Sequence, residues 1–350
     1  MLKSLHIKNF TVFSTVNLTF GKNLNVIVGE NGAGKTHILK AAYSAIAVSA
    51  AGKGKLTTKA QWQLALANKL LGVFRPDSLG RLVRRRVGRS KCELNYVFNK
   101  SAQNLSLIFS TVAKTEVKIK KAPSEFIDKQ PVFLPTRELL TIFPGFVSLY
   151  ENTHLPFEET WRDTCILLGA PLAKGPRLAL IGKLLKPLED SMGGRVEWDK
   201  SGRFYLNLTT GSMEMHLVAE GLRKLATIAR LIATGSLLDS GYLFWDEPES
   251  NLNPKILKGI AKTILQVAQN GVQVFIATHS LFLLRELHIL QQSSDFSQID
   301  AKYFGLHIDQ GGIVTVSQGS TIDEIGSIDS LDEDLQQSDR YMDTEMKLSN

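Results

Sequence analysis

One glycine-rich segment constrains the fold of this 350-residue chain more than any other part of the sequence. Residues 29–36 read Gly-Glu-Asn-Gly-Ala-Gly-Lys-Thr, which fits the pattern GxxxxGK followed by Ser or Thr. Such a loop lies between a buried strand and a helix, because its backbone amides must wrap closely around phosphate groups. The apolar run Leu24–Val28 and the helical periodicity after Thr36 supply both elements. The sequence therefore predicts a phosphate-binding loop in an α/β fold.

Each position of the loop has an expected role in binding ATP or GTP. The amides would hold the phosphates, Lys35 would reach the β- and γ-phosphates, and the Thr36 hydroxyl would ligate Mg²⁺. The candidate nucleotide-binding residues of this region are Gly29, Glu30, Asn31, Gly32, Ala33, Gly34, Lys35, Thr36 and His37.

Two further apolar strands end on candidate catalytic residues. Tyr242–Trp245 leads into Asp246, expected to hold Mg²⁺ through water, and Glu247, expected to polarise the attacking water as general base. Gln273–Ala277 leads into His279, which in this position would sense the γ-phosphate. An acidic exit turn or a surface His at a strand end also occurs without function. Their order after a phosphate loop favours the catalytic interpretation.

A fourth segment, Ala219-Glu220-Gly221, opens a long helix just before the acidic strand end. A glycine at a helix N-terminus can present backbone amides to an anion. An ordinary helix start has the same appearance, so this segment indicates little by itself.

The charge of the chain is distributed unevenly. The net charge is +7, yet the last thirty residues hold nine acids against Arg340 and Lys347. This asymmetry indicates a basic contact surface and an acidic tail. The basic surface could contact nucleic acid or an acidic partner, or be a solvated face. Its candidate contact residues are Arg81, Arg84, Arg85, Arg86 and Arg89.

Apolar residues recur in the acidic tail at three- and four-residue spacing. They predict a short amphipathic helix that docks on a partner or on a second protomer. A disordered, solubilising end is the alternative. The residues of this stripe are Ile322, Ile325, Ile328, Leu331 and Leu335.

Several classes of protein are disfavoured by the composition. The sequence has no run of 18 apolar residues, so we expect no membrane span. Its N-terminus lacks the apolar region of a secretory signal. The two cysteines, Cys92 and Cys165, form no CxxC pair, which predicts neither a disulfide framework nor a zinc site. We expect a soluble protein of the reducing cytoplasm.

The order of these motifs resembles the ABC-type ATPase head of the RecF, SMC and OLD proteins. It also resembles the small stand-alone ATPases of bacterial anti-phage defence operons. The residues that carry the resemblance are Asn9 and Phe10 (opening motif close to the nucleotide), Gly29–Thr36 (Walker A), Ala219, Glu220 and Gly221 (signature), Asp246 and Glu247 (Walker B), Ser250–Leu252 (D-loop) and His279 (switch histidine).

The resemblance implies a P-loop NTPase of ABC-ATPase type, with a mixed sheet, a parallel core, an antiparallel β layer and a helical lid. The head would span residues 1–320, with an inserted basic segment at 51–91 and the lid at about 137–192. Residues 321–350 would form the acidic, amphipathic tail. Gln130 is the candidate for the family's metal-binding Q-loop glutamine.

The resemblance also implies a mechanism. Two heads would sandwich two ATP molecules, each bound with Mg²⁺ by one P-loop and by the signature of the other subunit. Ala219 stands where the family usually has Ser, and this departure predicts weaker closure or slower hydrolysis. The function implied is an ATPase switch that controls a separate effector, a nuclease or a toxin, in anti-phage defence.

A RecF-like ATPase that clamps DNA is the alternative function. A transporter subunit is disfavoured, because the signature is not LSGGQ-like. Only about seventy residues follow His279, too few for the Toprim nuclease domain of the OLD proteins. We therefore expect no nuclease activity in this chain.

Overall fold

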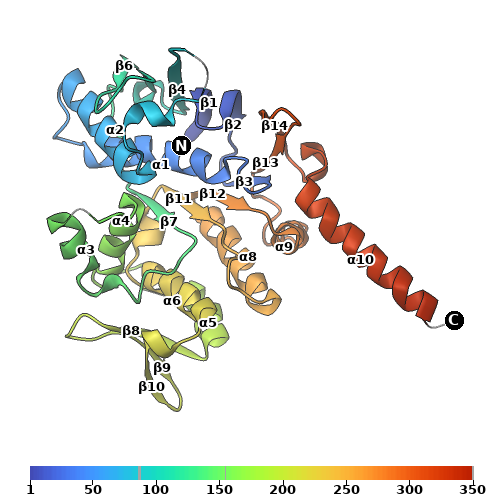
Figure 1. The fold of residues 1–350 in the computed structure, drawn as a ribbon. Helices are drawn as coiled ribbons and strands as arrows, with labels where there is room; N and C mark the ends of the chain where they lie inside the picture. Colours follow the sequence, from blue (N-terminus) through green and yellow to red (C-terminus); the bar gives the residue numbers. More distant parts are fainter. Residues whose placement is uncertain (86–87, 154, 349–350) are drawn as a thin grey trace.

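The computed structural model describes residues 1–85, 88–153 and 155–348. Its centre is a sheet of 11 strands (Figure 1). In spatial order these strands are β6 (Lys118–Lys121), β5 (Leu105–Ser110), β4 (Lys91–Phe98), β1 (Leu2–Phe10), β2 (Phe13–Thr19), β14 (Val314–Gly319), β13 (Ala301–Ile308), β3 (Leu24–Gly29), β12 (Gln273–Thr278), β11 (Tyr242–Asp246) and β7 (Pro131–Leu134).

One half of this sheet is parallel. Strands β13, β3, β12, β11 and β7 run in the same direction, and every residue of β3 and β12 is buried. Strands covered by helices on both faces bury all of their side chains, so they consist of continuous apolar residues. For this reason these strands could be predicted from the sequence. Because the strands are parallel, their carboxyl ends meet at one edge of the sheet.

Helices cover the two faces of the parallel half. Side chains such as Ile27 and Phe275 point to the face packed by α1 (Lys35–Ala51), and α2 (Lys59–Phe74) packs against α1 and β6. Alternate side chains such as Val26 and Ile276 point to the opposite face. The helices on that face are α6 (Glu220–Ala233), α8 (Pro254–Gln269) and α9 (Leu281–Gln291) (Figure 1).

The other half of the sheet is antiparallel. Strands β2, β1, β4, β5 and β6 pair antiparallel in that order. They join the parallel half through β14, which pairs antiparallel with β13 and parallel with β2. The mixed α/β fold with a parallel core is thus confirmed. The antiparallel strands continue the same sheet, because β14 bridges the two halves.

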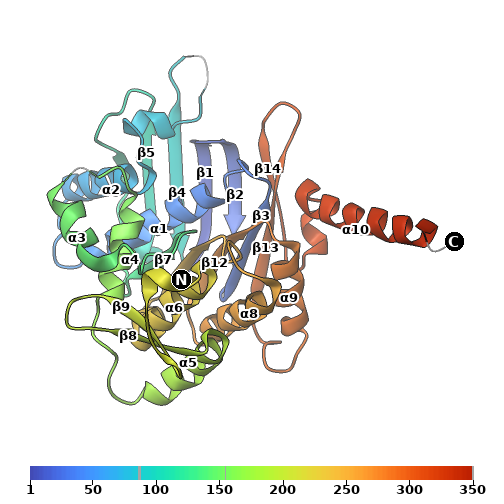
Figure 2. The same ribbon diagram turned by 60° about the horizontal axis from the view of Figure 1, so that its bottom comes forward.

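The segment after β7 contributes helices and a small second sheet. The helices are α3 (Phe143–Asn152), α4 (Glu159–Leu168) and α5 (Leu178–Met192). The three-stranded sheet consists of β8 (Gly194–Trp198), β9 (Phe204–Leu208) and β10 (Gly211–Glu214) (Figure 2). Strands β8 and β9 pair antiparallel and form a hairpin across residues 200–202. The remaining short elements are α7 (Ser236–Asp239), η1 (Leu79–Leu82), η2 (Ser101–Gln103), η3 (Met215–Leu217) and η4 (Asp323–Ile325).

The C-terminal helix α10 (Asp329–Leu348) projects away from the rest of the molecule in both views (Figures 1 and 2). The predicted amphipathic stripe is divided at the start of this helix. Ile325 and Ile328 precede α10 and are buried in the core. The side chains of Leu331 and Leu335 lie outside the described residues. Large apolar side chains exposed on α10 are Tyr341, Met342 and Met346.

None of the helices in the described ranges combines the length and the apolar character needed to cross a membrane.

Candidate active site

The phosphate loop connects β3 to α1 at the carboxyl edge of the sheet. Gly32 and Gly34 have φ values of 85° and 93°, a conformation that side-chain-bearing residues rarely adopt. A Cβ on Gly34 would also lie 2.7 Å from the side chains of Phe13 and Val12. Glycine at position 34 is therefore favoured by both the backbone conformation and the packing.

The Lys35 ammonium lies over the loop. Its Nζ donates to the carbonyl oxygens of Gly29 at 2.7 Å and Glu30 at 3.0 Å. Burial lowers the pKa of Lys35, and the carboxylates of Glu247 and Asp246 oppose that shift. A buried cation at the mouth of a loop of backbone amides is suited to phosphate oxygens.

Thr36 and Asp246 come from different elements and meet beside the loop. The Thr36 hydroxyl lies 2.9 Å from both carboxylate oxygens of Asp246. Burial raises the pKa of Asp246 to about 6, the Thr36 hydrogen bond lowers it, and nearby Glu247 raises it further. A hydroxyl and a desolvated carboxylate are hard oxygen ligands of the kind that Mg²⁺ takes together with phosphate oxygens and water. These two residues therefore fit a Mg²⁺ site.

Glu247 and His279 lie next to each other at the ends of β11 and β12. Glu247 has a φ of 46°, and its backbone N–H donates to Ala277 at 2.9 Å. Its Oε2 accepts from Ser250 Oγ at 3.1 Å, and its Oε1 is 3.7 Å from His279 Nδ1. A non-glycine residue held at positive φ carries backbone strain, which is often found at functional turns. The candidate base and the candidate switch histidine thus share one small region.

Lys224 is a residue of this region that sequence reasoning did not assign. It lies on α6, and its buried Nζ donates to the carbonyl oxygens of Glu247 at 2.8 Å and Ser250 at 3.2 Å. Burial lowers the pKa of Lys224 to about 8, against the opposing charges of nearby acids, foremost Glu249. The signal in the sequence was a lysine beside the inward-facing Leu225, on the apolar side of a predicted helix.

The signature segment contacts the turn that follows Glu247. Asn251 Nδ2 donates to the Glu220 carboxylate at 2.9 Å, and Asn251 has a φ of 62°. A Cβ on Gly221 would lie 2.8 Å from the Asn251 carbonyl oxygen. The start of α6, at Ala219–Gly221, and the D-loop turn therefore form one packed unit.

The opening motif ends β1, just before Val12 and Phe13, which lie against Gly34 of the phosphate loop, and its two residues differ in exposure. Asn9 has a φ of 51° and donates through Nδ2 to the Lys91 carbonyl oxygen at 3.1 Å. Phe10 is fully buried and packs edge-on against Phe74 at 5.4 Å between ring centroids. The Phe10 side chain thus belongs to the hydrophobic core.

His37, on the first turn of α1, packs against Phe74 at 5.8 Å between ring centroids. Burial, with a smaller contribution from Lys40, lowers the pKa of His37 to about 4. The imidazole is therefore neutral near pH 7, so it adds no positive charge to the phosphate loop.

The assignment of Gln130 as a metal ligand is wrong. Gln130 precedes β7, and β7 runs parallel to β11 with Pro131 opposite Tyr242 and Leu134 opposite Trp245. Gln130 thus lies at the amino edge of the sheet, whereas Asp246 lies at the carboxyl edge. Gln130 is five residues from the position opposite Asp246, which corresponds to about 16 Å along the strand. The residues that follow β7 at the carboxyl edge, on the side of Asp246, are 135–138.

The candidate basic residues are not equivalent. Arg84 braces the turn after β1, because its backbone N–H donates to Asn9 at 3.0 Å and its guanidinium donates to the Val12 carbonyl at 3.0 Å. Arg81 is exposed and lies 4.0 Å from Asp77. Arg85 and Arg89 are exposed, and Arg86 lies outside the described residues.

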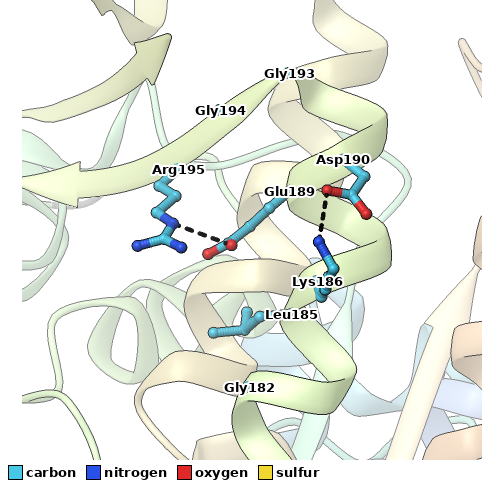
Figure 3. Close-up of a pocket in the computed structure, with 8 residues that line it drawn as sticks. All are labelled: Gly182, Leu185, Lys186, Glu189, Asp190, Gly193, Gly194 and Arg195. Atoms are coloured by element: carbon cyan, nitrogen blue, oxygen red, sulfur yellow. Dashed lines mark hydrogen bonds and ion pairs between the residues drawn. The ribbon is translucent and has the colours of Figure 1, made fainter. Parts of the chain in front are cut away.

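A separate hollow lies between α5 and β8, and none of the candidate catalytic residues lines it (Figure 3). Its charged side chains pair with one another. Lys186 lies 3.4 Å from Asp190, and Arg195 lies 3.2 Å from Glu189. We assign it no role in the ATP chemistry.

Two family models match the sequence. One, described as "AAA domain, putative AbiEii toxin, Type IV TA system", matches residues 115–285. The other, described as "AAA domain", matches residues 4–47 and thus includes the phosphate loop. None of the curated proteins matches the chain in sequence.

The structure is similar to solved SMC heads. An SMC head bound to the C-winged helix domain of ScpA has 13% identity and a TM-score of 0.53, covering 92% of this chain and 98% of that chain. An SMC head with an extended coiled coil, bound to the C-terminal domain of ScpA and derived from Pyrococcus furiosus, has 12% identity and a TM-score of 0.51. That match covers 97% of this chain and 99% of the other. Identities this low establish likeness of fold. Together with the two AAA family models, which match parts of the chain, this likeness supports the resemblance of the chain to the ABC-type ATPase heads of the RecF and SMC proteins.

Proposed function

We propose that this chain is an ATP-hydrolysing switch whose heads close around ATP. The observation that carries the proposal is the convergence of four side chains at the carboxyl edge of the parallel strands. These are Thr36, Asp246, Glu247 and His279.

The residues of this edge have complementary chemical roles. Lys35 and the loop amides bind the phosphates, while Thr36 and Asp246 would hold Mg²⁺, which supplies charge neutralisation at the β- and γ-phosphates. Glu247 accepts the proton of the attacking water, and His279 orients the reacting groups. Bringing these groups together lowers the entropic part of the barrier.

The signature segment supports a site shared between two copies. Residues Ala219–Gly221 open a helix of 14 residues, whose first amides are available to an anion. They pack on the turn that holds Asn251. In the closed dimer these amides would meet the γ-phosphate on the other subunit. Ala219 offers no hydroxyl there, so we expect slow hydrolysis.

Control of a separate effector is the wider role that we propose, within bacterial anti-phage defence in the cytoplasm. The description of the longer family model names a type IV toxin–antitoxin system, and the solved SMC heads carry a bound ScpA domain. The projecting α10, with Tyr341, Met342 and Met346 exposed, is suited to contact a nuclease or toxin, or a second protomer.

DNA clamping in the manner of RecF is the alternative function. It is favoured by the exposed basic side chains of Arg81, Arg85, Arg89 and Lys91 and by the lysines of edge strand β6. Binding to phosphate backbones would weaken steeply with salt, because counterions are released. A salt-independent association of this surface would instead indicate a protein partner.

Two variants test the proposed activity. Lys35→Ala removes the ammonium and is expected to abolish ATP binding. Glu247→Gln keeps the shape of the site but removes the base, so we expect ATP binding without turnover. Binding is measured with a fluorescent ATP analogue and turnover by phosphate release. Normal hydrolysis by the Glu247→Gln protein would refute the assignment of the base.

A further inference from the structure

A second acidic residue, Glu249, lies beside the switch histidine His279. It is only 8% exposed. Its Oε1 accepts a hydrogen bond from Thr278 Oγ1 at 2.7 Å and another from the His279 backbone N–H at 3.0 Å. One carboxylate oxygen thus connects the turn after β11 to the end of β12.

The hydrogen bonds continue beyond His279. Thr278 Oγ1 also accepts from the Ser280 backbone N–H at 3.0 Å. Ser280 Oγ in turn accepts from Leu283 N–H at 3.2 Å and caps the N-terminus of α9. Glu249 therefore anchors the backbone on both sides of His279.

The imidazole of His279 lies between two carboxylates. Its Nδ1 is 3.6 Å from Glu249 Oε1 and 3.7 Å from Glu247 Oε1. The His279 side chain is 43% exposed, so the ring reaches the surface of the site. A ring whose Nδ1 faces carboxylates keeps Nε2 for a contact on its other side.

The position requires an acceptor-only group. Glu249 Oε2 is buried and has no hydrogen-bond partner among the described residues. An amide here would either turn its NH₂ toward the His279 N–H or bury an unpaired donor at the place of Oε2. The charge of the carboxylate is offset nearby, because Glu249 is the acid that most strongly opposes the lowering of the Lys224 pKa.

We propose that Glu249 is the positioning residue for His279, holding its backbone and the Nδ1 side of its ring so that Nε2 faces the γ-phosphate. This inference rests on the proposed ATPase function for its kinetic consequences. Its structural consequence, a fixed orientation of the His279 ring, does not depend on turnover.

A double-mutant cycle tests whether Glu249 acts through His279. The variants are Glu249→Gln, His279→Ala and the double variant, with Glu197→Gln on exposed β8 as the matched control. We expect Glu249→Gln to lower kcat by about 10- to 100-fold, since small misplacement of a reacting group has effects of that order. KM for ATP should change less than about twofold.

The decisive comparison is made in the His279→Ala background. There Glu249→Gln is expected to cause no further loss of kcat, because its effect depends on the imidazole. An additive loss, a loss confined to KM, or a kcat equal to that of the Glu197→Gln control would each overturn the proposal.

Two further measurements keep the test independent of folding and of turnover. If the Glu249→Gln protein does not fold, Thr278→Val is used instead, because it removes one of the two hydrogen bonds to Glu249 Oε1. We expect Thr278→Val to lower kcat by less than Glu249→Gln would. This loss must also vanish in the His279→Ala background. An additive loss would contradict the proposal.

Absence of ATP turnover in the unmodified protein would refute the proposed function but not this inference. In that case the ring nitrogens of His279 are observed by two-bond ¹H–¹⁵N NMR in the Glu249→Gln or Thr278→Val protein. Shifted ring resonances support the positioning role, and unchanged resonances overturn it.

Discussion

Gly34 in the phosphate loop is subject to two independent constraints. Its φ of 93° disfavours any side chain, and a Cβ would lie 2.7 Å from Phe13 and Val12. We predict that Gly34→Ala lowers the free energy of unfolding by about 1–3 kcal/mol, from backbone strain and overpacking together. Urea unfolding of the nucleotide-free protein measures this change.

Gly182 is the matched control for that substitution. It lies inside α5, and a Cβ there would meet nothing within 4 Å. Gly182→Ala should raise the free energy of unfolding by about 0.5–1 kcal/mol, because alanine restricts the unfolded chain and favours helix. Equal changes in the free energy of unfolding for Gly34→Ala and Gly182→Ala would contradict the two constraints described for Gly34.

At the scale of elements, Lys224 ties helix α6 to the turn that carries Glu247. Its pKa of about 8 in the folded protein lies below the ordinary value of 10.5. Between these values the unfolded chain binds one proton more than the folded protein, so stability rises with pH. Below pH 8 the lysine is charged in both states, and the dependence disappears.

We predict that this rise is lost in Lys224→Met. Relative to that variant, the unmodified protein should gain about 2–3 kcal/mol of unfolding free energy between pH 8 and 10.5, at 1.36 kcal/mol per pKa unit. The measurement is urea unfolding of both proteins at a series of pH values. A constant difference across this range would show that Lys224 has an ordinary pKa.

Elements marked by a local pattern of apolar residues could be predicted from the sequence. Strands β3, β11 and β12 are continuous apolar runs that end on the candidate site residues. Gln130 could not be placed correctly, because the direction and register of β7 are determined by its pairing with β11. Lys224 and Glu249 could not be predicted as functional residues for a related reason. Their partners lie on other elements, so no local pattern marks them.

At the scale of the whole molecule, the C-terminal helix α10 extends away from the body (Figure 1). A helix of 20 residues that projects from the body lacks much of the tertiary packing that gives protein helices most of their stability. Ile325 and Ile328 anchor the segment before it, whereas Tyr341, Met342 and Met346 remain exposed. A partner or a second protomer that covers these side chains would stabilise the helix.

We predict that removing residues 329–350 lowers the mass of the assembly measured by light scattering. ATP binding should be unchanged, because Ile325 and Ile328 are retained. Replacing Tyr341, Met342 and Met346 by Ser should reproduce the effect without shortening the chain. An assembly of unaltered mass in both proteins would refute the docking role of α10.

We expect each ATP site to be shared between two heads, with the phosphate loop of one facing the signature of the other. Lys35→Ala inactivates a site from its own side, and Ala219→Asp inactivates the partner's site by placing a negative charge at the exposed start of the signature helix. Each variant alone should have no ATPase activity. In a mixed dimer, the signature variant supplies an intact phosphate loop and the Lys35→Ala variant supplies an intact signature. These two intact parts face each other and form one complete site.

Mixing the two inactive proteins and measuring phosphate release tests this claim most directly. At equal concentrations, half of the dimers are mixed and each holds one intact site, so activity should return to about a quarter of the unmodified level. Absence of any recovery over all mixing ratios would contradict the shared site.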